Sequence, residues 1–299
     1  MRFDSFQPAN DNDLADYGDF TVTLPDPIAI ERSARNRQGR GRTHPSHRSC
    51  AVEAGPTPAE PVSDDTRFTI VSQNAPCMLF RNRRQSRFGG LSAKTRRLVS
   101  GVGPHELAAW KEFETNQRWV DFDMQTARVA WTAVANQASY LADSIAVDDI
   151  GDVHTQEIKA DPSYFAEPDY DHVMRHAEQG FGEAGMAFEK LIGPALRGSE
   201  RKQLNVDRAF GDRFTYVSPQ ARNLVQSLLK KAPIVALGEI EDLLDNDPLT
   251  ARAKANALLC ERAIGFGLDQ RLTRETLVTA PVWPSTFPDI RALRYDNDN

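Results

Sequence analysis

The sequence predicts an α/β protein, with a mixed β-sheet flanked by helices and followed by a small helical domain. Three observations predict this class. Stretches rich in β-branched and aromatic residues, typical of strands, gather in the middle of the chain, at residues 119–122, 129–131, 140–147 and 153–159. Apolar residues at helical spacing occur on both sides of them. Beyond residue 205 the pattern changes to short helices.

The 299 residues give room for two modest domains. We expect a disordered leader over residues 1–67, because this stretch has too few clustered apolar residues to offset chain entropy. The sheet domain is expected over residues 68–204, the helical domain over 205–280 and a tail over 281–299. No apolar run is long enough to cross a bilayer, and the three cysteines are scattered, so we expect a cytoplasmic protein with no membrane partner.

In the sheet domain, residues 68–71 read as a short strand, and a helix is expected after Gly103-Pro104, where proline suits the first turn. The strands at 119–122 and 129–131 precede a hairpin over 140–159. A long amphipathic helix is then expected to pack across the sheet. Its apolar positions are Val173, Ala177, Phe181, Ala184, Phe188 and Leu191.

In the second half, helices are expected after Pro219, around residues 240–244 and over residues 251–261. Residues 265–278 are compatible with a small terminal hairpin. Three helices plus a hairpin is a winged-helix-like pattern, although any small helical bundle gives similar spacing. The tail shows no usable periodicity.

The predicted hairpin carries the chemistry. The small, acidic, Gly-containing segment 148–152 suits a tight connection. If the turn is centred on Ile150, Asp143 lies opposite Glu157, and Lys159 shares a face with Glu157 because side chains alternate along a strand. Two facing carboxylates repel each other unless a cation lies between them. The arrangement therefore indicates a divalent metal site.

Asp143 and Glu157 offer the hard oxygen ligands that Mg²⁺ prefers, and Glu106, near the start of the preceding helix, is the best candidate for a further carboxylate. Lys159 cannot be a ligand while it is protonated. Its expected role is to orient or help deprotonate an attacking water and to offset charge in phosphodiester hydrolysis. The predicted catalytic set is Glu106, Asp143, Glu157 and Lys159, with the three carboxylates as metal ligands.

The formal net charge is −6, but the charges segregate along the chain. A basic stretch without acidic residues contains Arg81, Arg83, Arg84, Arg87, Lys94, Arg96 and Arg97, and a second one spans residues 32–48. Such stretches can neutralise DNA phosphates. A solvated surface or a partner-binding tail explains the charge equally well. Arg252, Lys254 and Arg262 are open to the same two interpretations.

Other features favour structural roles. His172 and His176 have a spacing that can hold zinc, but no third ligand is obvious, so a helix-surface pair is favoured. Trp110, Trp119 and Trp131 fall at apolar-periodic positions and are expected in the core rather than stacked on bases.

Around the predicted catalytic residues, the sequence resembles the restriction-endonuclease-like nucleases, and within them the TnsA transposon-end endonucleases. The similar segments are Ser92-Ala-Lys-Thr-Arg-Arg-Leu-Val-Ser100, Glu106 with Trp119-Val-Asp-Phe-Asp-Met-Gln125, Tyr140-Leu-Ala-Asp143 and Glu157-Ile-Lys159. The likeness covers residues 91–278. It departs at Ala142, where the family usually has Pro, and at Thr126, where Pro is common.

The resemblance implies a restriction-endonuclease-like fold, with Glu106, Asp143 and Lys159 as the catalytic set and Glu157 as the metal-side partner. It also implies a Mg²⁺-dependent DNA endonuclease, with Mn²⁺ as a substitute, that cuts one strand of double-stranded DNA at each transposon end, while a DDE transposase cuts the other strand. Its implied partners are a DDE transposase and an ATP-dependent regulator. Two alternatives stay open: a nuclease of the same fold in restriction, repair or phage recombination, and a non-catalytic DNA-binding or assembly protein.

Overall fold

The computed structural model describes residues 66–72, 86–133 and 136–296. All of them belong to one compact unit, Ala51–Asn299. The predicted leader lies outside the described residues except for its last two positions, and so does the basic stretch over residues 32–48. Within the described ranges, no helix is both long enough and apolar enough to span a membrane.

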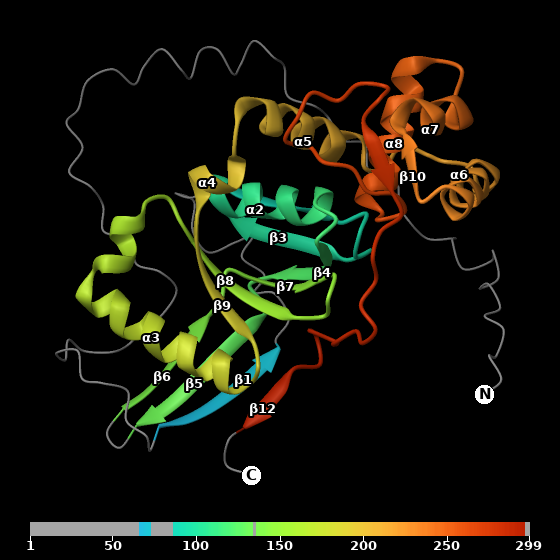
Figure 1. Ribbon diagram of the computed structural model, residues 1–299. Coiled ribbons are helices and arrows are strands. Elements are labelled where there is room, and N and C mark those ends of the chain that lie inside the picture. The colour runs from blue at the N-terminus through green and yellow to red at the C-terminus, as the bar shows by residue number, and fades with distance from the viewer. Residues whose placement is uncertain (1–65, 73–85, 134–135, 297–299) are drawn as a thin grey trace, which may run out of the picture. The chain divides into compact units, whose positions relative to one another are not determined.

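A mixed four-stranded sheet forms the centre of the α/β part (Figure 1). Its strands, in spatial order, are β4 (Trp119–Met124), β7 (Ser144–Asp148), β8 (Val153–Lys159) and β9 (Ala187–Ile192). Strand β7 runs antiparallel to both β4 and β8, whereas β9 is parallel to β8. Parallel neighbours need a crossover, and the 3₁₀ segment η2 (Pro162–Ala166) and helix α3 (Pro168–Glu183) provide it. The predicted mixed sheet is confirmed.

Two helices cover the opposite faces of this sheet (Figure 1). Helix α2 (Pro104–Thr115) packs with Phe122 and Met124 of β4 and with Ala146 of β7. Helix α3 packs with Ile145 and Val147, the alternate residues of β7. This alternation follows from the period of two along a strand, and it explains why β7 reads as a continuous apolar run: both of its faces are buried.

Further strands extend the α/β part. A second, antiparallel sheet has the order β12 (Arg294–Asp296), β1 (Arg67–Ser72), β5 (Ala127–Ala133) and β6 (Asn136–Leu141). A separate antiparallel pair consists of β2 (Arg87–Leu91) and β3 (Leu98–Val102). The strand expected at residues 68–71 is thereby confirmed. Trp110, Trp119 and Trp131 are 3%, 6% and 5% exposed, as expected of core residues.

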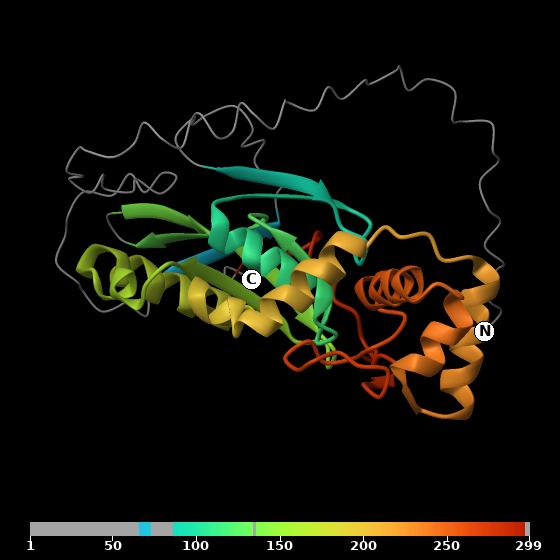
Figure 2. The ribbon, with the colours of Figure 1, turned by 90° about the horizontal axis from the view of Figure 1, so that it is seen from above.

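The C-terminal part is mostly helical. Its elements are α4 (Gly193–Arg197), α5 (Glu200–Asp212), α6 (Pro219–Lys231), β10 (Ile234–Ala236), α7 (Leu237–Leu244), α8 (Pro248–Cys260) and β11 (Leu277–Thr279). Helices α6 to α8 gather into one cluster in Figures 1 and 2. Side chains of Ser199, Ser218 and Asp247 cap the N-termini of α5, α6 and α8. The domain boundary predicted between residues 204 and 205 falls inside α5 and stays a prediction.

The expected continuous strand over residues 140–147 is wrong. Strand β6 ends at Leu141 and β7 begins at Ser144, and the two strands lie in different sheets. Ala142 and Asp143 form the junction, where the backbone N–H of Ala142 donates to Ala127 O and that of Gln125 donates to Asp143 O. Propensity could not reveal this break, because the residues on both sides of it favour strands.

The expected long helix over residues 173–191 is also wrong in its second half. Helix α3 ends at Glu183, and Phe188 and Leu191 lie in strand β9. Gly185 follows with a φ of +74°, a conformation that glycine adopts without strain and that ends the helical path. Phe188 and Leu191 continue the helical spacing only by coincidence.

The small hairpin expected over residues 265–278 does not form, and a long-range pairing takes its place. Strand β11 pairs with β10 rather than closing a hairpin with residues 265–269, although Gly265 makes a single bridge to Thr279. The tail, which shows no periodicity, returns to the second sheet: β12 pairs antiparallel with β1, and Ile290 is buried in the core beside it.

Candidate functional site

The hairpin of β7 and β8 has the predicted register. Val147 pairs with Val153 and Ser144 with Gln156, which centres the turn on Ile150. Extending this ladder by one residue puts Asp143 opposite Glu157. The carboxylate of Asp143 also reaches across the ladder, where its Oδ2 accepts a hydrogen bond from the backbone N–H of Ile158 at 2.9 Å.

Glu157 and Lys159 share one face of β8, as the alternation predicts. The ammonium group of Lys159 donates to Glu157 Oε1 in an ion pair, in which the Glu157 side chain is 3% exposed and that of Lys159 is 23% exposed. Lys159 Nζ also lies 5.0 Å from the ring centroid of Tyr170, a cation–π contact. The pair is therefore largely removed from water.

Glu106 reaches the same site from the first turn of α2. Its Oε2 accepts hydrogen bonds from the backbone N–H of Val102 and from the Gln125 side-chain amide, both at 3.0 Å. Gly101 leaves room for this carboxylate, because a Cβ added there would lie 2.7 Å from Glu106 Oε2. The first turn of a helix suits a carboxylate, since the helix dipole is positive at that end.

The electrostatics show that these groups affect one another. Burial raises the pKa of the Glu106 carboxyl to about 7; the hydrogen bond from Val102 opposes the rise and the Glu157 carboxylate adds to it. The pKa of Asp143 lies well above its usual value, first because of burial and then because of the charges of Glu157 and Glu106. Burial acts to lower the pKa of Lys159, but Glu157 and Asp143 outweigh it and the pKa is raised. The four predicted residues thus form one electrostatic cluster with more acids than bases.

The donor set fits Mg²⁺ in its chemistry. Glu106 and Asp143 each use one oxygen for protein hydrogen bonds, and within the described residues the other oxygen of each makes none. Mg²⁺ is commonly held by one or two carboxylates while it keeps several waters. In the described part of the chain, no three His, Cys, Asp or Glu side chains are arranged so that they could hold a metal together. Within the described residues, the three carboxylates predicted as metal ligands therefore do not form such a group, and Glu106 and Asp143 are the two that keep an oxygen without a protein hydrogen bond.

Three residues of the site escaped sequence reasoning. Tyr140 donates its hydroxyl to Glu157 Oε2, and Tyr170 donates its hydroxyl to Glu157 Oε1. Burial, and then the Glu157 carboxylate, raise the pKa of both phenols, so they stay hydrogen-bond donors. Gln125 joins two candidates, because its side chain binds Glu106 and its backbone N–H donates to Asp143 O. Its φ of +55° is unusual for a residue other than glycine, and no pattern in the sequence signals it.

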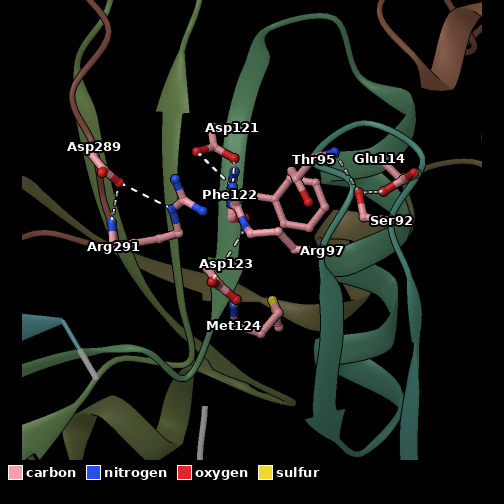
Figure 3. Close-up of polar contacts among 10 residues, drawn as sticks. All are labelled: Ser92, Thr95, Arg97, Glu114, Asp121, Phe122, Asp123, Met124, Asp289 and Arg291. Carbon is pink, nitrogen blue, oxygen red and sulfur yellow. Dashed lines mark hydrogen bonds and ion pairs between the residues drawn. The ribbon is translucent and has the colours of Figure 1, made fainter. Parts of the chain in front are cut away.

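The basic stretch before α2 does not form a DNA-facing surface at Lys94 and Arg97. Lys94 Nζ donates to the carbonyls of Phe113, Asn116 and Trp119 at 2.6–2.9 Å. Arg97 points back to β4, where it pairs with Asp121 at 2.5 Å and donates to Phe122 O (Figure 3). These cations anchor the segment between β2 and β3. Arg81, Arg83 and Arg84 lie outside the described residues.

The basic residues at and after α8 are also structural. Arg252 pairs with Glu241, and Lys254 pairs with Asp245 at 2.7 Å. Arg262 is 2% exposed and donates to the carbonyls of Gln117 and Val282. None of the three is a free cation facing solvent, so the interpretation as a DNA surface is not favoured here.

The predicted histidine pair lies on α3, with ring centroids 4.4 Å apart. His176 stacks on Trp131 at 5.1 Å, and its Nδ1 bonds to the His172 carbonyl at 2.9 Å. The expected helix-surface pair is wrong for His176, which is only 4% exposed and packs against the second sheet.

A second polar cluster occupies the turn end of the same hairpin. His154 lies between two carboxylates, with Nε2 3.0 Å from Asp148 Oδ2 and Nδ1 3.0 Å from Glu189 Oε1. Arg118 lies 3.7 Å from Asp148 and its guanidinium covers the Trp119 ring. The other oxygen of Asp148 accepts the backbone N–H groups of residues 150–152. Both carboxylates of this cluster are hydrogen-bonded to His154, and Asp148 also holds the turn backbone, which makes the cluster a structural tie.

Comparison with known proteins adds no assignment: the sequence matches no protein-family model, and no curated protein is similar enough to count as a match.

Proposed function

We propose that the chain is a Mg²⁺-dependent DNA endonuclease that hydrolyses a phosphodiester bond in double-stranded DNA. The observation that carries the proposal is the convergence of Glu106, Asp143, Glu157 and Lys159 at one end of the mixed sheet. An excess of carboxylates beside one half-buried lysine is poorly explained as a stabilising cluster, because like charges largely removed from water destabilise the fold. It suits a site that gains a divalent cation and a phosphate.

The arrangement of elements supports the resemblance to restriction-endonuclease-like nucleases. The sheet β4-β7-β8-β9 is mixed and has a helix on each face, as that resemblance implies. The C-terminal order α6, β10, α7, α8, β11, with the bridge between Gly265 and Thr279, is compatible with a winged-helix-like domain. On this basis we propose TnsA-type cleavage at transposon ends, with a DDE transposase and an ATP-dependent regulator as partners.

In this mechanism Glu106 and Asp143 are the residues that would hold the cation, since each keeps one carboxylate oxygen without a protein hydrogen bond. When bound, Mg²⁺ would supply Lewis acidity toward a phosphate oxygen. Lys159 orients the attacking water and offsets the charge that develops on the phosphate. Gln125 keeps the Glu106 carboxylate in place, and the backbone N–H of Ile158 does the same for Asp143.

The test is nicking of supercoiled plasmid DNA with Mg²⁺ or Mn²⁺, by the protein alone and together with any transposase and ATPase that neighbouring genes encode. Asp143→Asn and Lys159→Met should each lower the nicking rate by about 100-fold or more while DNA binding in a gel-shift assay persists. Lys190→Met is the matched control, because Lys190 is exposed and only pairs with Glu178 at 3.6 Å.

One observation favours a second candidate, a DNA-binding protein without turnover. Both oxygens of Glu157 are already engaged by protein donors, so this carboxylate is not offered to a metal. The nicking assay separates the two. If the wild type binds DNA but never cuts it with either metal and all partners, the endonuclease proposal is wrong. If neighbouring genes encode no transposase or ATPase, only the transposition pathway loses support.

A further inference from the structure

Glu157 differs from the other two carboxylates of the site in how its oxygens are used. Oε1 accepts from the Lys159 ammonium and from the Tyr170 hydroxyl, and Oε2 accepts from the Tyr140 hydroxyl. Glu106 and Asp143 each use a single oxygen for protein hydrogen bonds within the described residues. To bind a cation, Glu157 would have to give up donors that the fold supplies.

The two tyrosines come from separate elements. Tyr140 lies in β6 of the second sheet, is 8% exposed and meets the Phe188 ring edge-on at 6.0 Å. Tyr170 lies in the first turn of α3, beside Phe165 at 6.2 Å. Because each ring is held by its own packing, the hydroxyls fix the Glu157 carboxylate from two sides.

Tyr170 also contacts the lysine directly. Its hydroxyl binds the same Glu157 oxygen as Lys159, and its ring lies 5.0 Å from Lys159 Nζ. The ammonium is thereby confined between a carboxylate and an aromatic face. A lysine has four rotatable side-chain bonds, so such confinement restricts where its charge can act.

We propose that Tyr140 and Tyr170 are positioning residues that hold Glu157 against Lys159, so that Glu157 orients the lysine and leaves metal binding to Glu106 and Asp143. This proposal rests on the proposed nuclease function and refines it. It revises the expectation that all three carboxylates are metal ligands, and it assigns a role to two residues that the sequence did not reveal.

The first test measures Mn²⁺ binding by electron paramagnetic resonance, without DNA. Asp143→Asn and Glu106→Gln should weaken the Mn²⁺ affinity by about tenfold or more, as the loss of a ligand does. Glu157→Gln should leave it close to that of the wild type. If Glu157→Gln weakens Mn²⁺ binding as strongly as Asp143→Asn does, the proposed division of roles is overturned.

The second test follows Lys159 itself in metal-free protein labelled with ¹⁵N-lysine. The Nζ signal of a confined ammonium is observable because its protons exchange slowly with water. We expect this signal in the wild type and its loss by exchange in Tyr170→Phe, in Tyr140→Phe and in Glu157→Gln. Tyr216→Phe is the matched control, because Tyr216 is 74% exposed. A Lys159 signal unchanged in both site tyrosine variants would refute the positioning role.

The third test uses the kinetics of plasmid nicking. Tyr170→Phe keeps the ring beside Lys159 and removes only the hydroxyl, so kcat should fall by about tenfold while KM for DNA stays the same. Tyr170→Leu removes both contacts and should lower kcat further. A change in KM alone would contradict the proposal. If the wild type neither cuts DNA nor binds Mn²⁺, the proposed function fails, but the Lys159 signal still decides whether the tyrosines position the lysine.

Discussion

The two ends of the β7–β8 hairpin carry polar clusters of opposite character. At the turn end, Asp148 accepts three backbone N–H groups and a contact from His154, and these lower its pKa although burial acts to raise it. At the open end, burial and neighbouring carboxylates raise the pKa of Asp143 well above its usual value. Asp143, just before strand β7, and Asp148, its last residue, thus have opposite effects on the fold.

The difference between these two clusters shows how charged groups that stabilise the fold can be told apart from charged groups that serve a function in this protein. A cluster whose carboxylates already have hydrogen-bond donors within the protein, such as that around His154, stabilises the fold and needs no further partner. The cluster around Asp143 places three carboxylates beside one ammonium and costs stability. Proteins keep such costly groups where they serve a function, so the open end is the better candidate site.

Removing the carboxylate at the turn end should have the largest effect on stability. Asp148→Ala leaves three backbone N–H groups and His154 without their acceptor, and should lower the free energy of unfolding by about 3 kcal/mol. Urea denaturation measures the change. Asp152→Ala, at an exposed position of the same turn, is the control and should change stability by less than about 0.5 kcal/mol. Equal effects of the two variants would mean that the turn cluster is not a structural tie.

Neutralising the aspartate at the open end should do the opposite. Asp143→Asn removes one member of a repelling set and should stabilise the metal-free protein at pH 8. Adding Mg²⁺ should raise the melting temperature of the wild type more than that of the variant, because only the wild type keeps the full ligand set. If Asp143→Asn is less stable than the wild type when both are free of metal, the contrast drawn between the two ends of the hairpin is wrong.

The open end should also make stability depend on pH. The pKa of Glu106 is raised from its usual value of 4.5 to about 7, so its protonated form favours the folded state. This contribution is complete below pH 4.5 and is lost as the pH rises through 7. Between pH 6 and pH 8 the metal-free protein should therefore lose about 1.3 kcal/mol of stability from this group.

Urea denaturation across this pH range checks the expectation. Glu106→Gln should flatten the profile, since glutamine does not titrate. Mn²⁺ affinity should rise over the same range in the wild type, because binding then no longer competes with the proton. A profile that is equally steep in wild type and variant would assign the pH dependence to another group.

The smallest effect is expected at the rim of the turn cluster. The side chain of Arg118 is 48% exposed and lies 3.7 Å from Asp148, so Arg118→Gln should cost no more than about 0.5 kcal/mol. Thermal denaturation at low and at high salt measures it. A loss as large as that of Asp148→Ala would show that the guanidinium, rather than His154 and the turn N–H groups, holds the cluster together.

The sequence predicted the parts of the fold that depend on local signals. The turn at residues 148–152, the helix beginning at Pro104 and the helices after Pro219 all have short-range signatures, and the structure confirms them. Strand β9 and the ladder between β1 and β12 have none. Phe188 and Leu191 keep helical spacing inside a strand, and the tail pairs with residues far away in the chain. Such pairings are set by tertiary contacts that propensity does not contain.

The site was predictable to the same extent. The period of two along β8 predicts that Glu157 and Lys159 share one face, and the register of the turn predicts that Asp143 lies opposite Glu157. The roles of Tyr140, Tyr170 and Gln125 depend on side chains that arrive from another sheet, a helix and a junction. Only three-dimensional packing brings these groups to the carboxylates. Whether the four predicted residues cut DNA stays a prediction.

The pairing of β12 with β1 has a consequence for how the chain reaches its fold. Strand β1 lies at residues 67–72 and its outer neighbour at 294–296, so nearly the whole described chain must be synthesised before that edge can close. Until then, the backbone groups along the outer edge of β1 are open to strands of other molecules. During synthesis on the ribosome, this edge is where chaperones or a slow elongation rate would matter most.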